Sequence, residues 1–260
     1  MIPLKDHNPT HKFAVLTALL IAACVYVFIA VQPTSRVGIT EGADPCVDVE
    51  FTVKNAAIPD EVVTGEPLSA QEVQELVQGQ CAVGATGDEA VFPAKRVWFA
   101  MVVSMFLHGS WLHLGGNMLF LWVFGNNIED HWGKVAYLAF YLVSGLAATV
   151  AHVAVQPNSV VPVVGASGAI AGVMGAYLVL FPKVPIKTLF TLGFFIFLRD
   201  VPAWMLLGFW LISQFFINPN AGVAWMAHVG GFVFGVAVGL IVRAVRPPER
   251  RREVFSFTQY

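Results

Sequence analysis

The chain has 260 residues, of which 57% are hydrophobic and 12% charged, and its mean hydropathy is +0.68. This composition excludes a soluble globular domain and predicts a polytopic membrane protein. The formal net charge of −2 gives no sign of a nucleic-acid partner, and none is expected.

Six apolar runs are candidates for membrane spans, although the second is short as an uninterrupted run. They lie at Phe13–Val31, Trp111–Phe124, Val135–Val155, Val163–Phe181, Pro202–Ile217 and Trp225–Val242. A shorter apolar patch, Thr188–Leu198, cannot cross as a helix, and we interpret it as an interfacial or re-entrant turn. The predicted fold is therefore an all-α membrane protein with six transmembrane helices.

Basic residues predict how these helices are oriented. Lysines precede the first span and occupy the loops after the second and fourth spans, and five arginines follow the sixth. Because an excess of Lys and Arg marks the cytoplasmic side, both the N-terminus and the C-terminus are predicted to be cytoplasmic. No clear cleavage site follows the first apolar run, so we expect a retained helix rather than a signal peptide.

The loop between the first two spans differs in composition from the rest of the chain. Residues 32–96 carry eleven acidic residues and are rich in Pro and Gly, which predicts a water-exposed extracytoplasmic segment. Ser69 and Glu72 have the spacing of a capping box, and they predict a short helix that ends before Gly79. Cys46 and Cys81 favour a disulfide in an oxidising compartment, with two free thiols as the alternative.

Polar residues open the second, fourth and sixth spans, which all run inward from the outer face. The opening segments are HGSWLHLGGN, GASG and AHVGG. Ser167 and His228 lie three to four residues inside their apolar runs, or about 5–8 Å below the outer surface at 1.5 Å per residue. Polar side chains within a membrane raise the free energy of the folded protein, so each of them indicates a structural or functional role.

The residue types at this depth fit nucleophilic catalysis. A neutral histidine that accepts a hydrogen bond from a serine activates the hydroxyl, so Ser167 and His228 are predicted to form a dyad. His113 and Asn117 share a helical face, and with the Ser167 N–H they are predicted to stabilise an oxyanion. No Asp or Glu lies within a span, so we expect packing, rather than a carboxylate, to hold His228.

Glycines beside these residues are predicted to bring the helices together. Gly165 and Gly168 flank the serine, and Gly231 and Gly235 follow the histidine, where they permit close backbone approach. Taken singly, a serine among glycines is more often a packing residue, and a lone intramembrane histidine or asparagine often bridges helices. The catalytic interpretation rests on all of these polar groups lying at the outward ends of helices with the same direction.

The segments HGSWLHLGGN, GASG and AHVGGFVFG, in this order, resemble the rhomboid family of intramembrane serine proteases. The resemblance covers about Val97–Val242. It implies a six-helix core that cleaves transmembrane segments of other proteins near their outer ends. By motif match it makes Ser167 the nucleophile and His228 the base, with His113 and Asn117 as the oxyanion-hole pair.

The resemblance also implies a division of the chain. The expected parts are a cytoplasmic tail at 1–12, a first helix at 13–31, the acidic loop at 32–96, a catalytic core at 97–245 and a basic cytoplasmic tail at 246–260. It implies a multi-pass protein of a bacterial plasma or inner membrane, with transmembrane proteins as substrates and lipids as further partners. The oligomeric state stays open.

Two positions relate this chain to particular features of the family. Glu129, in the segment GNNIEDHWG, matches the structural acid of the turn after the second span. Some members have a tyrosine one turn after the serine that stacks on the histidine, but here that position is Ala171. This leaves open what orients His228.

A substrate helix must unwind before it is cut, because a helical carbonyl is occupied by its own hydrogen bond. Span five and the loop Asn218–Ala224 are the candidates for a gate.

The main alternative function is a non-catalytic rhomboid-like protein that binds membrane proteins without cutting them. A transporter is disfavoured because the polar groups gather near one face. The sequence has no zinc-site H-E-x-x-H, no intramembrane aspartate pair and no cofactor motif, so neither metal nor cofactor is expected.

Overall fold

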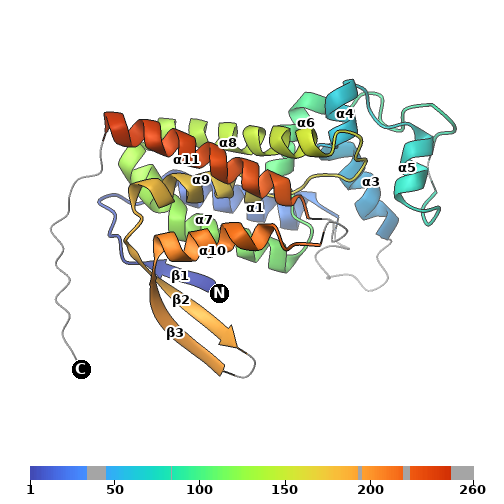
Figure 1. Ribbon diagram of the computed structural model, residues 1–260. Helices are drawn as coiled ribbons and strands as arrows, with labels where there is room; N and C mark the ends of the chain where they lie inside the picture. The colour runs from blue at the N-terminus through green and yellow to red at the C-terminus, as the bar shows by residue number, and fades with distance from the viewer. Residues whose placement is uncertain (34–44, 83, 193–194, 219–222, 247–260) are drawn as a thin grey trace, which may run out of the picture.

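A computed structural model describes residues 1–33, 45–82, 84–192, 195–218 and 223–246. It shows a bundle of helices with a small sheet on one side and a helical cap at one end (Figure 1). The arginines of the predicted tail beyond residue 246, Glu41 and Asp44 of the acidic loop, and most of the candidate gate loop lie outside the described residues.

A helix occupies each of the six predicted apolar runs. The helices are α1 (Val15–Tyr26, continued by the π-helix η1, Val27–Val31), α7 (Trp111–Trp132), α8 (Lys134–Val155), α9 (Ser167–Leu180), α10 (Ala203–Gln214) and α11 (Trp225–Val245). By length and composition α8 and α11 are able to cross a membrane. A third candidate is α7 taken together with Val97–Phe106, which it meets at an 82° bend, whereas the other three helices are apolar but shorter.

The core is built around α9, which packs against α11, α8 and α7 and is buried along most of its length. Small residues allow this packing: a Cβ added to Gly235 of α11 would overlap the carbonyl of Gly172 on α9, and one added to Gly231 would overlap the carbonyl of Gly168. Helix backbones thus touch without intervening side chains, which is how small residues join membrane helices.

Glu129 of α7 fixes the start of α1. Its carboxylate accepts hydrogen bonds from the backbone N–H groups of Leu16 and Thr17 and from the Thr17 hydroxyl, at 2.8–2.9 Å. These N–H groups belong to the first turn of a helix, where no intrahelical partner exists. The acid at the end of α7 therefore caps the first helix of the bundle.

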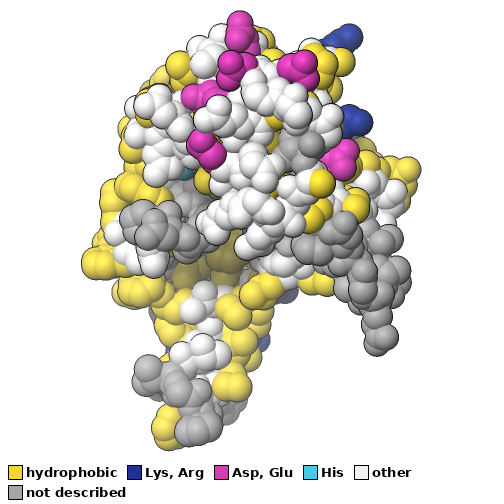
Figure 2. Space-filling model, turned by 90° about the vertical axis from the view of Figure 1, so that its right-hand side faces the viewer, with side chains coloured by type: hydrophobic (Ala, Val, Ile, Leu, Met, Phe, Trp, Pro, Cys, Tyr) yellow, Lys and Arg dark blue, Asp and Glu magenta, His cyan; other side chains and the backbone are white. Residues whose placement is uncertain are grey.

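The cap comprises residues 45–96 and contains α3 (Pro45–Asn55), α4 (Pro59–Thr64) and α5 (Ala70–Leu76). It has a small apolar core of its own, and acidic side chains gather on its outer surface (Figure 2). The predicted capping box is confirmed: Ser69 accepts a hydrogen bond from the Glu72 N–H, and the Glu72 carboxylate accepts one from the Ser69 N–H. The helix α6 (Val97–Val103) and the short 3₁₀ turn η2 (Ser104–Phe106) lead from the cap into α7.

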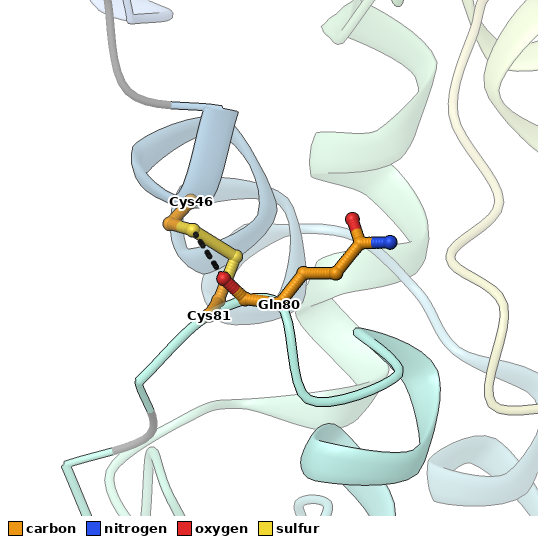
Figure 3. The surroundings of a disulfide bond; sticks show 3 residues. All are labelled: Cys46, Gln80 and Cys81. Carbon is orange, nitrogen blue, oxygen red and sulfur yellow. Dashed lines mark hydrogen bonds between the residues drawn. A yellow bond between two sulfur atoms is a disulfide. The ribbon is translucent and has the colours of Figure 1, made fainter.

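A disulfide joins Cys46 and Cys81 across a sequence separation of 35 residues (Figure 3). Cys46 lies at the start of α3, with its sulfur beside the backbone carbonyl of Gln80, and Cys81 follows the turn after α5. The bond therefore joins the start of the cap to the turn after α5.

A three-stranded antiparallel sheet corrects the all-α prediction. Its strands are β1 (Ile2–Asp6), β2 (Pro185–Leu192) and β3 (Phe195–Pro202), in the order β1-β2-β3. The sequence predicts an interfacial or re-entrant turn at Thr188–Leu198, but the described residues of this segment lie in the paired strands β2 and β3. Its interfacial position stays a prediction. Its β-branched and aromatic residues favour a strand, and Phe190 pairs and stacks with Phe197 across the hairpin at 5.3 Å between ring centroids.

Candidate active site

Ser167 is the first residue of α9 and lies two residues after Gly165, whose backbone has a conformation that L-residues rarely adopt. Gly165 has φ +122°, and a Cβ there would come within 2.8 Å of the His113 ring. Its N–H donates to the Ser104 carbonyl at 2.9 Å, which fixes the turn. A Cβ on Gly168 would approach that of Ala148 to 2.6 Å. The glycines thus let the serine lie at a helix start in tight contact with its neighbours.

His228 lies in the first turn of α11 and faces Ser167. The distance from His228 Nε2 to Ser167 Oγ is 2.8 Å, which is a hydrogen bond. The glycine contacts between α9 and α11 set this distance, because they bring the two helix backbones together beside the pair. The hydroxyl and the imidazole are therefore within the reach that proton transfer requires.

Gln214, the last residue of α10, holds the other side of the imidazole. Its Oε1 lies 2.7 Å from His228 Nδ1, while its Nε2 donates to the Trp210 carbonyl at 3.0 Å. Since the amide nitrogen is engaged with Trp210, the amide oxygen faces the ring. Nδ1 is then the protonated nitrogen, and Nε2 is left as the acceptor for the Ser167 hydroxyl.

The expectation that packing holds His228 is therefore incomplete, because a side-chain amide binds it. The indole of Trp210 also lies 5.9 Å from the imidazole between ring centroids, on the helix that carries Gln214. Ala171, at the position where the rhomboid resemblance implies a tyrosine in some members, is buried in the core of the bundle. One feature of the sequence points to Gln214. It is a polar residue near the outer end of span five, at the depth where Ser167 opens span four.

His113 and Asn117 line the same cavity as the dyad. The cavity has a volume of about 450 Å³ and is also lined by Ser167, His228 and Gln214. The Asn117 amide nitrogen donates to the His113 carbonyl at 3.0 Å, so this side chain must turn to reach a bound oxyanion. Figure 2 views this end of the bundle and shows a hollow with hydrophobic walls beneath the acidic side chains of the cap.

Backbone contacts connect the cap to the segment before Ser167. The Val163 N–H donates to the Ala57 carbonyl at 2.8 Å, and the Ala57 N–H donates to the Ser104 hydroxyl at 2.7 Å. A buried ion pair between Lys95 and Glu61 holds this part of the cap. Burial raises the pKa of the Glu61 carboxyl and lowers that of the Lys95 ammonium, although each opposes the shift of the other.

The fold and the cavity define a membrane-embedded helical protein with a hydrogen-bonded serine–histidine pair. Residues 95–245 match the family model described as the Rhomboid domain, and the chain belongs to the rhomboid family.

Several curated proteins are similar to this chain. It is 31% identical to Rhomboid protein 1, mitochondrial, of Saccharomyces cerevisiae over 167 residues, which are 59% of this chain and 44% of the yeast protein. It is 28% identical to Rhomboid protease AarA of Providencia stuartii over 196 residues, 69% of this chain and 66% of that protein. It is 29% identical to Rhomboid-type serine protease 2 of Emericella nidulans over 241 residues, 86% of this chain and 43% of that protein.

These matches show the family and the membrane location that comes with it. The chain spans less than half of the length of the yeast and Emericella proteins. The names of the relatives include mitochondrial and chloroplastic proteins as well as proteases, so the compartment differs from one relative to another.

Proposed function

We propose that this protein is an intramembrane serine endopeptidase. It cleaves transmembrane segments of other membrane proteins near the extracytoplasmic face, through an acyl-enzyme. The observation that carries the proposal is the 2.8 Å contact between Ser167 Oγ and His228 Nε2 in a cavity at the end of the bundle. Relatives that are named as proteases support this reaction class.

The dyad performs the reaction in two halves. Ser167 Oγ attacks the scissile carbonyl while His228 Nε2 takes its proton, and His228 then gives that proton to the leaving amine. A water molecule next attacks the acyl-enzyme, with His228 as base, and Ser167 recovers its proton. Gln214 keeps the proton-bearing Nδ1 in place and favours the imidazolium that forms in each half.

The oxyanion of each tetrahedral intermediate is bound at the start of α9. The Ser167 N–H belongs to the first turn of a helix, so it has no intrahelical partner and is available to donate. His113 and Asn117, from α7, line the same cavity and complete the oxyanion hole.

The catalytic core at residues 97–245 and the first helix together cross the membrane six times, with both termini cytoplasmic. The helix α9 has 14 residues, or about 21 Å, which falls short of a hydrocarbon core of about 30 Å. The cavity lies beside the first turns of α9, so water reaches Ser167 below the outer surface. We place the protein in a bacterial plasma or inner membrane, with transmembrane proteins as substrates and lipids as its surroundings.

The helix α10 is the gate for substrate entry. It carries exposed apolar side chains on its outer face, among them Trp204, Phe209 and Ile212. It also carries Gln214, so a displaced α10 releases His228 from its amide partner. Cleavage therefore requires the helix to return once the substrate has entered.

The test is labelling of the purified protein in detergent with a serine-reactive fluorophosphonate or isocoumarin probe. Wild-type protein should label, whereas the Ser167→Ala and His228→Ala variants should not. Labelling that persists in Ser167→Ala would mean that another residue is the nucleophile. If folded wild-type protein neither labels nor cleaves reconstituted transmembrane substrates, the non-catalytic binding function is favoured instead.

A further inference from the structure

The far end of the β2–β3 hairpin is apolar and exposed. Four consecutive residues of β3, Phe195, Ile196, Phe197 and Leu198, are 73%, 70%, 41% and 47% exposed. Successive side chains of a strand point to opposite faces, so both faces of the hairpin are apolar here. A contiguous exposed apolar surface of this kind marks an interaction site.

The base of the hairpin has the opposite character. Lys187 pairs with Asp200 in the β2–β3 register and with Lys5 in the β1–β2 register, and Arg199 is the neighbouring residue of β3. All four charged side chains are exposed. The hairpin is therefore divided along its length into a charged base beside the bundle and an apolar far end.

The hairpin continues directly into a helix with an apolar outer surface. The strand β3 ends at Pro202 and α10 begins at Ala203, and Trp204 and Phe209 of α10 are 53% and 58% exposed. In Figure 1 the hairpin extends from the start of α10 away from the bundle. Its apolar surface thus adjoins the surface that α10 presents to lipid.

These features favour lipid over a protein as the partner. A protein docked on a sheet covers one face, whereas here both faces are apolar and open. The cations at the base match the anionic headgroups of a cytoplasmic leaflet. The strand β1 pairs with β2 only from Ile186 to Leu189, so the far end has two strands whose outer backbone groups need water. This requirement places the hairpin in the headgroup boundary rather than in the hydrocarbon centre.

We propose that the β2–β3 hairpin is an interfacial membrane anchor. Its apolar end, Phe195–Leu198, lies at the boundary of headgroups and acyl chains, and Lys187 and Arg199 contact anionic lipid. The anchor fixes the start of α10 at the surface of the leaflet. The choice of leaflet rests on the topology proposed above, and the anchoring itself is independent of proteolytic activity.

The experiment measures contact between the hairpin and lipid in the intact protein. An Ile196→Cys variant, made in a Cys24→Ala background, is labelled with an environment-sensitive fluorophore and reconstituted into vesicles with a spin-labelled quencher on the upper acyl chain. A Glu66→Cys variant, labelled in the exposed part of the cap, is the matched control. We expect several-fold stronger quenching at position 196 than at position 66, and a further increase when phosphatidylglycerol is added to phosphatidylcholine.

Charge removal tests the base of the hairpin in the same assay. The Lys187→Gln and Arg199→Gln substitutions should abolish the increase caused by phosphatidylglycerol while the quenching in phosphatidylcholine remains. Equal, weak quenching at positions 196 and 66 in protein that melts like wild type would overturn the proposal. Dilution of the protein into excess lipid separates its copies but keeps each copy in contact with lipid. Shielding of the fluorophore from water that disappears on this dilution would also overturn the proposal, because a second copy of the chain would then be the partner.

Discussion

The amide oxygen of Gln214 lies 2.7 Å from His228 Nδ1, and the opposite ring nitrogen of His228 lies 2.8 Å from Ser167 Oγ. The histidine is thus held between the end of α10 and the start of α9. In the proposed mechanism the amide performs the orienting task that a carboxylate performs in a serine protease triad, without adding a buried charge. Orientation of the base therefore depends on the position of the proposed gate helix.

Replacing this amide should slow the chemistry without unfolding the protein. In Gln214→Met the side chain keeps its length but loses the acceptor for Nδ1–H, so we expect probe labelling to slow by roughly 10–100-fold. Gln214→Glu retains an oxygen at this position and should recover much of the rate. The measurements are labelling rate and melting temperature. Labelling of Gln214→Met at the wild-type rate would contradict the assigned role of the amide.

Some of this arrangement could be predicted from the sequence because it follows from periodicity and depth. Six apolar runs each contain a helix, and matched depth on helices of the same direction predicted that Ser167 and His228 would meet. The sequence prediction lacks Gln214 because it considers only carboxylates as the third group. The β2–β3 hairpin could have been predicted, because its β-branched and aromatic residues favour strands. The pairing of β1 could not, because β1 pairs with a segment about 180 residues away and such long-range pairing leaves no local pattern.

The close contact between α9 and α11 requires a glycine at position 235. A Cβ at Gly235 would overlap the backbone of Gly172, which no side-chain rotation relieves. We therefore expect Gly235→Ala to destabilise the protein by about 1–3 kcal/mol and to abolish labelling, since the helices that carry Ser167 and His228 must separate. The measurement is thermal unfolding in detergent, together with probe labelling.

The matched control is Gly208→Ala in the middle of α10. Nothing lies within 4 Å of a Cβ at this position, so the substitution should leave the protein as stable as wild type or slightly more stable. If Gly208→Ala and Gly235→Ala lower the melting temperature equally, close packing at Gly235 does not explain the effect.

The disulfide should stabilise the cap more than the bundle. It closes a segment of 35 residues, and losing such a cross-link costs roughly 2–4 kcal/mol. In a Cys46→Ser, Cys81→Ser double variant we expect faster cleavage within residues 45–96 by an added protease. Probe labelling should also slow, because the cap binds the segment before Ser167 through the hydrogen bond between Val163 and Ala57. The effect should be less than tenfold, because the cross-link itself lies in the cap.

Reductant provides the control for this prediction. It should make the wild-type cap as protease-sensitive as that of the double variant, and it should have no effect on the double variant itself. A wild-type cap that resists protease equally well with and without reductant would show that its apolar core is sufficient without the cross-link.

Asp6 of β1 links the sheet to the bundle and should make stability depend on pH. It accepts hydrogen bonds from the Tyr177 hydroxyl of α9 and the Asn127 amide of α7. Burial raises the pKa of its carboxyl from the ordinary 3.8 to about 6, although these two hydrogen bonds act in the opposite direction. Between these two values the folded protein binds more protons than the unfolded chain, so stability falls as the pH rises from about 4 to about 6.

The Asp6→Asn variant isolates this contribution. Both hydrogen bonds reach the same carboxylate oxygen, Oδ2, so an asparagine keeps their acceptor while removing the charge. We expect the melting temperature of the variant, relative to wild type, to increase as the pH rises from 4 to 7, whereas the exposed Asp88→Asn control should follow wild type. The quantity to compare is the difference in melting temperature between Asp6→Asn and wild type. If this difference is the same at pH 4 and pH 7, Asp6 is not protonated preferentially in the folded protein.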